Sequence, residues 1–162
     1  MVDQISDLLM RKIEGYCSYQ ERCIQDVVVK LHEWKVQPLH VSRIIERLKN
    51  TGFVNEERFV RAYALGKFHQ NKWGKNKIYR SLVQKQIPEL FIGIGIGGID
   101  QEEYEKTLKK LIRDKAKDFL PLKKTDPEKF RYQIASSMIG KGFEAALTWH
   151  HILEIFADKP KK

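Results

Sequence analysis

The apolar residues of this chain recur with one spacing in three separate stretches. "VVVKLHEWKV" (27–36), "IYRSLVQKQI" (78–87) and "IASSMIGKGF" (134–143) superpose with offsets of 51 and then 56 residues, and the alignment continues without a gap beyond them. The matched positions are Val27, Ile78 and Ile134; Leu31, Leu82 and Met138; Val36, Ile87 and Phe143; Val41, Ile92 and Thr148; Ile45, Ile96 and Ile152; Leu48, Ile99 and Ile155. Seventeen of these eighteen positions are apolar in a chain that is 42% hydrophobic, which indicates an internal repeat.

The spacings within each repeat predict helices. Val27 and Leu31 are four residues apart, which gives the inner face of a first helix. A break follows at a proline or glycine, and the next three apolar positions of the first repeat lie at i, i+4 and i+7, the face of a second helix. Because no segment shows sustained period-two alternation, no strands are expected.

Capping signals predict a third helix in the first two repeats. Gly52 suits the left-handed residue that ends a helix, and Asn55 is an N-cap for a helix over about 56–67. In the middle repeat, Asp100 is the N-cap for "QEEYEKTLKKLIRDKAKDF".

We therefore predict an all-α protein of three tandem three-helix, helix-turn-helix-like repeats that form an elongated, curved molecule. The expected boundaries are 1–18 for a lead-in helix, then 19–70, 71–120 and 121–162, the last with a basic C-terminal tail. A three-helix unit of about 50 residues has a marginal core, so neighbouring repeats must bury one another's apolar faces. Such a body suits a long partner better than a small ligand, and we expect it to be a monomer.

The positive charge is concentrated in one part of the chain. The net charge is +9, yet the 31 residues between Glu57 and Glu89 contain no acid, and the remainder is nearly neutral. The bases of this acid-free stretch are Arg58, Arg61, Lys67, Lys72, Lys75, Lys77, Arg80 and Lys85. Such a concentration attracts polyanions or acidic proteins, which favours a binding role over a basic face kept for solubility.

Aromatic residues lie among these bases. Phe59 and Tyr63 are four apart and are typical of one buried helix face. Trp73 stays open as a candidate for stacking on the bases of a single strand, although core packing is the simpler interpretation.

Signals of other chemistry are weak. Cys17 and Cys23 fit neither a zinc knuckle nor a redox pair and are expected to be core or half-buried thiols. His150 and Glu154 are four apart on a helix and could form half of a metal site, but no second ligand cluster is evident, so a surface pair is favoured. No catalytic triad or carboxylate pair stands out. We expect no enzyme activity, no metal and no cofactor.

The segment "IGIGIGGID" (92–100) contains Gly93-x-Gly95-x-x-Gly98, the spacing of a dinucleotide-binding fingerprint. Such a fingerprint follows a strand and opens a helix, whereas a predicted helix precedes this segment. The repeat alignment places it in the second helix of the middle repeat. Each glycine inside a helix costs about 0.8–1 kcal/mol relative to alanine, so we predict a shortened or frayed, mobile helix; a nucleotide-binding enzyme would rest on these glycines alone.

Nothing in the sequence indicates a membrane span or secretion. The longest uncharged run, 90–99, is too short to cross a bilayer. The N-terminal stretch has acids within its apolar pattern and no small-residue cleavage site. We expect a cytoplasmic protein.

The chain resembles the RecX family of bacterial recombination regulators over about residues 15–156. The resemblance rests on "NEERF" (55–59) with Tyr63, on "WGK" (73–75) with Ile78 and Leu82, and on the turn at 138–143, "MIGKGF". There are departures. Lys35 and Gln86 replace the family's turn glycine, and Ser81 stands where a glutamate is frequent.

The resemblance implies a non-enzymatic protein that lies along the groove of the RecA recombinase filament and restrains filament growth, ATP hydrolysis and strand exchange. By position in the "WGK" region, Lys72, Lys75, Lys77 and Arg80 are the first candidates for contacts with RecA or DNA. Further candidates are Arg58, Arg61, Lys67, Lys85 and Trp73. Arg58 has an equal alternative as a structural residue that pairs with an acid across its helix cap. A second hypothesis is a helical module that binds single- or double-stranded DNA directly, independent of RecA.

Overall fold

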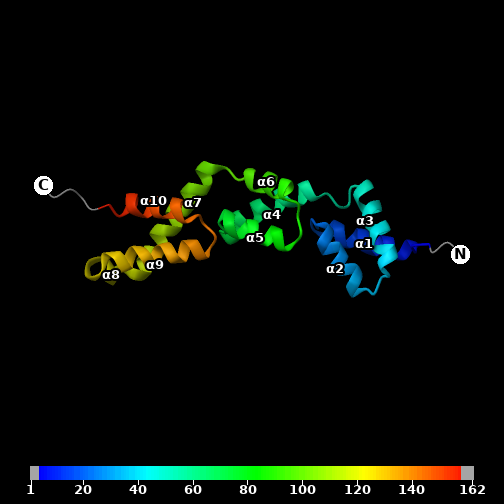
Figure 1. The fold of residues 1–162 in the computed structure, drawn as a ribbon, viewed down its shortest axis with the longest axis horizontal. Coiled ribbons are helices and arrows are strands. Elements are labelled where there is room, and N and C mark those ends of the chain that lie inside the picture. The colour runs from blue at the N-terminus through cyan, green and yellow to red at the C-terminus, as the bar shows by residue number, and fades with distance from the viewer. Residues whose placement is uncertain (1–3, 158–162) are drawn as a thin grey trace. The chain divides into compact units, whose positions relative to one another are not determined.

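The computed structural model describes residues 4–157, and every regular element in that part of the chain is helical (Figure 1). The elements are α1 (Asp7–Tyr19), α2 (Ile24–Glu33), α3 (Pro38–Asn50), α4 (Glu56–Asn71), α5 (Lys75–Gln84), α6 (Glu89–Gly97), α7 (Gln101–Ala116), the 3₁₀ turn η1 (Lys117–Phe119), α8 (Leu120–Thr125), α9 (Pro127–Gly140) and α10 (Ala145–Ile155). The all-α prediction is confirmed. The start of the expected lead-in segment (1–3) and most of the basic tail (158–162) lie outside the described residues.

Backbone contacts divide the chain into two compact units. The N-terminal unit comprises the chain up to Tyr63 together with Leu82–Gly95, and the C-terminal unit comprises Ala64–Ser81 together with the chain from Ile96 onward. The repeat boundaries expected from the sequence stay predictions.

In the N-terminal unit, α2 packs against α1 and α3. The core formed by α1 to α3 and the following loop consists of Met10, Ile13, Cys17, Val27, Leu31, Ile44, Leu48 and Val54. Cys17 and Cys23 are buried free thiols, as expected, and burial raises the pKa of each to about 11. Cys23 is also the N-cap of α2, because its Sγ accepts the Asp26 N–H at 3.4 Å while the Asp26 carboxylate accepts the Cys23 N–H at 3.1 Å.

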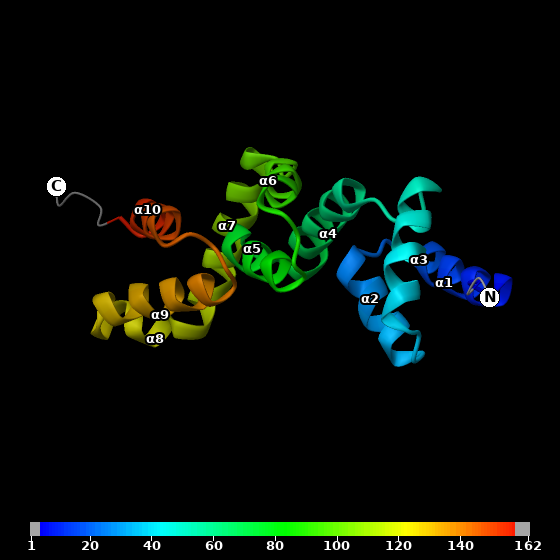
Figure 2. The ribbon, with the colours of Figure 1, turned by 45° about the vertical axis from the view of Figure 1, so that its right-hand side comes forward.

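In the C-terminal unit, α9 packs against α7, α8 and α10 (Figure 2). The buried residues of these helices and of the α9–α10 turn include Tyr104, Leu108, Ile112, Phe130, Ile134, Met138, Phe143 and Ile152. Asp100 is the N-cap of α7, as predicted, and its carboxylate accepts the Glu103 N–H at 2.9 Å.

The repeat positions face inward, as predicted. None of the eighteen is exposed, and those that are only half-buried are Val36, Val41, Ile45, Ile96 and Ile155. The same offsets align one further column that the apolar pattern missed, Ile44, Gly95 and His151, and all three residues are buried. Its members share burial but no side-chain chemistry, so apolar spacing alone does not mark this column.

The turn after the first helix of each repeat uses a left-handed residue. Lys35, Gln86 and Gly142 occupy matched positions and have φ angles of 58°, 58° and 97°. The two departures from the family's glycine therefore keep the backbone conformation that glycine favours.

Helix α4 begins after Asn55, as predicted, because the Asn55 side chain accepts the Arg58 N–H at 2.9 Å. It ends at Asn71, four residues beyond the expected end. Lys72, with a φ of 56°, supplies the left-handed stop, and the Trp73 N–H returns to the Lys67 carbonyl at 3.1 Å. No glycine directly follows the last residue of this helix to mark its end in the sequence.

Helix α6 is shortened, as predicted, with 9 residues against 13 in α3. It follows helix α5, and no strand occurs in residues 4–157, so the context of a dinucleotide fingerprint is absent from the described chain. A Cβ on Gly95 would lie 2.7 Å from the carbonyl oxygen of Val60, so glycine is required where α6 meets α4.

Candidate functional site

The loop of residues 72–75, here named the WGK loop, joins α4 to α5 in the C-terminal unit. The Gly74 N–H donates to the Lys141 carbonyl at 2.8 Å, and the Asn76 N–H donates to the Gly142 carbonyl at 2.9 Å. A Cβ on Gly74 would lie 2.2 Å from the Gly142 carbonyl carbon. The loop is therefore held in direct backbone contact with the α9–α10 turn.

Trp73 is half-buried, and two lysines lie close to its ring. The Lys67 and Lys77 ammonium groups stand 4.8 Å and 4.6 Å from the centroid of its ring. Both distances fall within the range of cation–π attraction. The indole ring therefore attracts two ammonium groups, and both stay close to the WGK loop.

Lys72 and Arg80 are exposed, and neither has an ion-pair partner among the residues that the structure describes. Their charges are not neutralised locally, so they contribute fully to the positive field near the WGK loop. Of the predicted contact residues, these two are the most available to an anionic partner.

Lys75 supports the loop from within the C-terminal unit. Its ammonium group donates to the Gln101 side-chain oxygen at 2.6 Å, and its backbone N–H donates to the Tyr104 hydroxyl at 3.0 Å. Tyr104 is fully buried and donates to Glu144. Burial, reinforced by this hydrogen bond, raises the pKa of Tyr104 far above its usual value, so the phenol stays a donor.

Arg58 and Arg61 belong to the N-terminal unit and have acidic partners there. The Arg58 guanidinium contacts Glu21 at 2.6 Å and donates to the Gly52 carbonyl at 2.9 Å. Arg61 pairs with Glu57 one helical turn away at 3.1 Å. These contacts favour the structural interpretation of Arg58.

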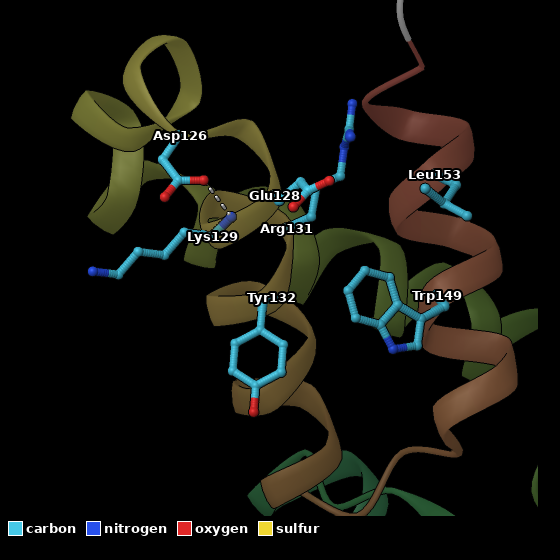
Figure 3. A pocket seen from close by; sticks show the side chains of 7 residues that line it. All are labelled: Asp126, Glu128, Lys129, Arg131, Tyr132, Trp149 and Leu153. Carbon is cyan, nitrogen blue, oxygen red and sulfur yellow. Dashed lines mark hydrogen bonds between the residues drawn. The ribbon is translucent and has the colours of Figure 1, made fainter.

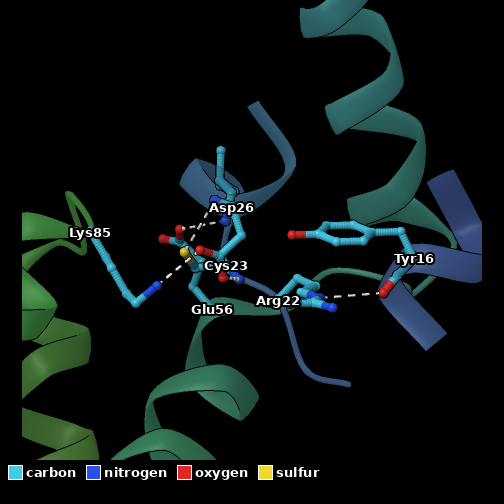
Figure 4. A network of polar contacts seen from close by, with 7 residues as sticks. Tyr16, Arg22, Cys23, Asp26, Glu56 and Lys85 are labelled. Atoms are coloured by element: carbon cyan, nitrogen blue, oxygen red, sulfur yellow. Dashed lines mark hydrogen bonds and ion pairs between the residues drawn. The ribbon is translucent and has the colours of Figure 1, made fainter. Parts of the chain in front are cut away.

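Lys85 is bound to Asp26 at 2.9 Å in the polar network that Figure 4 shows, with Cys23 and Glu56 beside it. Burial acts to raise the pKa of the Asp26 carboxyl, but hydrogen bonds from Lys85 and the Cys23 backbone hold it below its usual value. Burial likewise acts to lower the pKa of Lys85, and Asp26 raises it overall. Lys85 therefore joins the α5–α6 turn to the start of α2.

A groove of about 590 Å³ lies between α9 and α10 (Figure 3). Tyr132 stands on one wall and Trp149 and Leu153 on the other, while the remaining lining residues are Asp126, Glu128, Lys129 and Arg131. Because its charged residues have both signs, the groove shows no preference for an anion.

The sequence found the bases of the acid-free stretch but missed the residues that hold the WGK loop. Gly142 and the half-buried Lys141 make the backbone contacts with this loop from a distant part of the chain. The sequence does carry a sign of this contact, because "WGK" and "KGF" each contain a glycine, Gly74 and Gly142. A side chain at either position would collide with the other segment.

Among the described residues, no helix is both long enough and apolar enough to cross a membrane. These features are those of an all-helical repeat protein with a basic, aromatic loop held against the α9–α10 turn.

Residues 55–92 match the family model described as RecX, second three-helix domain. Regulatory protein RecX of Clostridium acetobutylicum is 26% identical over 136 residues, which cover 83% of this chain and 62% of that protein. The corresponding protein of Oceanobacillus iheyensis is 26% identical over 133 residues, 82% of this chain and 47% of its own length. The chain thus spans less than two thirds of these relatives.

Two solved structures share the fold. The crystal structure of RecX from Lactobacillus salivarius aligns with a TM-score of 0.80 at 19% identity, over 90% of this chain and 93% of that one. A crystal structure of regulatory protein RecX aligns with a TM-score of 0.74 at 21% identity, over 93% and 72%. The resemblance to the RecX family drawn from the sequence is confirmed by the family model and by these relatives.

Proposed function

We propose that this chain is a non-enzymatic regulator that binds the RecA–DNA filament and restrains its ATPase activity, strand exchange and extension. Its similarity to proteins named regulatory protein RecX supports this proposal. The observation that carries it is the WGK loop, whose backbone is fixed while Lys72 and Arg80 remain unpaired within the described residues. A filament that contains DNA presents phosphates to such a surface.

The test is a titration of RecA ATPase activity on single-stranded DNA with wild-type protein and with the Lys72→Glu/Arg80→Glu double variant. Wild type should slow hydrolysis at near-stoichiometric amounts. The double variant should need about tenfold more protein, because each reversal replaces an attraction by a repulsion. The matched control is Lys106→Glu/Lys110→Glu, the same charge change at exposed positions of α7. Failure of wild type to bind or slow RecA, or an equal loss in the control, contradicts the proposal.

Lys72→Gly separates loss of contact from loss of folding. Because Lys72 has a φ of 56°, glycine fits its backbone better than lysine does. This variant should unfold at the wild-type temperature or above it and yet inhibit RecA less. Unchanged inhibition would remove Lys72 from the interface.

Direct binding of nucleic acid is the second candidate function. Trp73, with Lys67 and Lys77 close to its ring, has the combination of aromatic ring and basic side chains that proteins use to hold single strands. This alternative requires comparable affinity for DNA with and without RecA. Dependence of DNA retention on RecA would leave the regulator as the better description.

A further inference from the structure

Three potential metal ligands gather in the last turns of α10. The ligand atoms of His150, His151 and Glu154 all lie within 4.8 Å of one another. The Glu154 carboxylate oxygen lies 3.7 Å from His150 Nε2 and 3.7 Å from His151 Nδ1. The sequence showed only His150 and Glu154 as a half-site, because His151 belongs to the buried column that the apolar pattern missed.

A carboxylate from α7 orients the His151 ring. His151 Nε2 lies 2.8 Å from one Glu105 carboxylate oxygen, and the other Glu105 oxygen accepts from the Gln101 side-chain amide at 3.2 Å. A carboxylate accepts a hydrogen bond from Nε2–H, and the imidazole tautomer with its proton on Nε2 has its lone pair on Nδ1.

His151 Nδ1 is left without a partner. The side chain is 3% exposed, and Nδ1 is buried with no hydrogen bond within the described chain. The Glu154 carboxylate, which is also an acceptor, lies 3.7 Å from it. Two acceptors turned toward each other leave a buried polar atom unsatisfied, and a cation between them removes this cost.

We propose that His150, His151 and Glu154 bind a divalent transition metal of the zinc class, with Glu105 as the carboxylate that holds His151 in its ligating tautomer. Two imidazoles and one carboxylate form a known zinc-binding set with an open fourth position. A carboxylate behind a ligating histidine is the usual supporting contact of such sites.

The geometry and the helix both suit a cation. With bond lengths of about 2.0–2.1 Å, tetrahedral ligands stand about 3.3 Å apart; two ligand pairs here lie 3.7 Å apart and the third within 4.8 Å, so side-chain rotations would bring the three atoms to a common ion. The site lies near the C-terminus of α10, where the unpaired carbonyls favour positive charge. Imidazole nitrogens favour zinc over magnesium or calcium, which prefer oxygen ligands.

The test is calorimetric titration of metal-free, untagged full chain with Zn²⁺ and, separately, with Mg²⁺. Wild type should bind one Zn²⁺ at this site and no Mg²⁺. His150→Ala and Glu154→Gln change side chains that are 69% and 63% exposed, so both variants should fold normally and bind Zn²⁺ at least about tenfold more weakly. The matched control is His69→Ala, which removes the histidine of an exposed pair with Glu103 at 3.1 Å and should leave affinity unchanged.

Glu105→Gln tests the supporting contact and should weaken Zn²⁺ binding by about ten- to hundredfold. Nuclear magnetic resonance of the His151 ring gives a second readout, with Nδ1 metal-bound and Nε2 still protonated. Two outcomes overturn the proposal. One is equal Zn²⁺ affinity in wild type, His150→Ala and Glu154→Gln, and the other is no Zn²⁺ binding with a proton on Nδ1 in its place.

Discussion

Two glycines of α6 differ in the space around them, so their substitution by alanine should have opposite effects on stability. A Cβ on Gly95 would lie 2.7 Å and 2.9 Å from the oxygen and Cβ of Val60, whereas a Cβ on Gly97 would meet no atom within 4 Å. Gly95→Ala should lower the free energy of unfolding by about 1–3 kcal/mol through steric overlap. Gly97→Ala should raise it by a few tenths to about 1 kcal/mol. Urea unfolding of the two variants gives both values, and a stabilising Gly95→Ala would show that α6 and α4 do not touch there.

The Asp26–Lys85 pair should make stability depend on pH at both extremes. The pKa of Asp26 is lowered by folding, so its contribution is present above its unfolded value of about 3.9 and is lost as pH falls through the folded value. The pKa of Lys85 is raised by folding, so its contribution is present below about 10.4 and is lost as pH rises through the folded value.

Lys85→Met should therefore lower the free energy of unfolding by about 1–2 kcal/mol at neutral pH, because it leaves the half-buried Asp26 carboxylate without its counter-charge. The difference from wild type should shrink at both pH extremes in urea unfolding. Lys117→Met removes an exposed pair with Asp114 and should cost less than about 0.5 kcal/mol. A pH-independent Lys85→Met effect would assign the loss to packing.

At the scale of the element, the three matched turns differ in strain. Lys35 and Gln86 are exposed and have left-handed backbone conformations, which glycine adopts without strain. Lys35→Gly and Gln86→Gly also add entropy to the unfolded chain, so each should raise the free energy of unfolding by at most about 1 kcal/mol. Gly142→Ala should destabilise it, since a Cβ there would lie 2.3 Å from the Lys77 Cβ. Thermal unfolding of the three variants measures the contrast. Destabilisation by both glycine substitutions would show that the long side chains have a role in packing.

The sequence predicted the helices well because apolar spacing and capping residues are local signals. Asn55 and Asp100 begin helices as their side chains indicate. The sequence did not predict the end of α4, because Lys72 adopts a left-handed backbone conformation that is unusual for lysine. The sequence also did not show that position 95 must be a glycine, because this requirement comes from contact with Val60, a residue of a different helix.

The candidate site was predicted only as a set of charges. Composition identified the bases, but the partners that occupy Lys75 and Lys85 are Gln101 and Asp26, which lie 26 and 59 positions away along the chain. Such contacts are set by tertiary packing and leave no local pattern. The structure therefore reduces the list of basic residues to the few whose charge has no partner within the described residues.

At the scale of the whole molecule, the acid-free stretch contributes residues to both compact units. In the N-terminal unit its bases are engaged with Glu21, Glu57 and Asp26. In the C-terminal unit Lys72 and Arg80 have no acidic partner among the described residues. The excess of positive charge thus has its largest unneutralised effect in the C-terminal unit, where an anionic partner should bind.

Salt dependence of DNA binding tests this conclusion and separates the two candidate functions. If the chain binds single-stranded DNA by itself, the logarithm of affinity should fall steeply with the logarithm of salt concentration, because phosphate contacts release counterions. Lys72→Glu/Arg80→Glu should then reduce that slope by about two, one for each lost phosphate contact, while Lys106→Glu/Lys110→Glu should leave it unchanged. Fluorescence anisotropy with labelled oligonucleotide gives the slopes. A flat salt dependence in wild type would exclude direct DNA binding, and an equal change in the control pair would show that net charge, not the positions of Lys72 and Arg80, sets affinity.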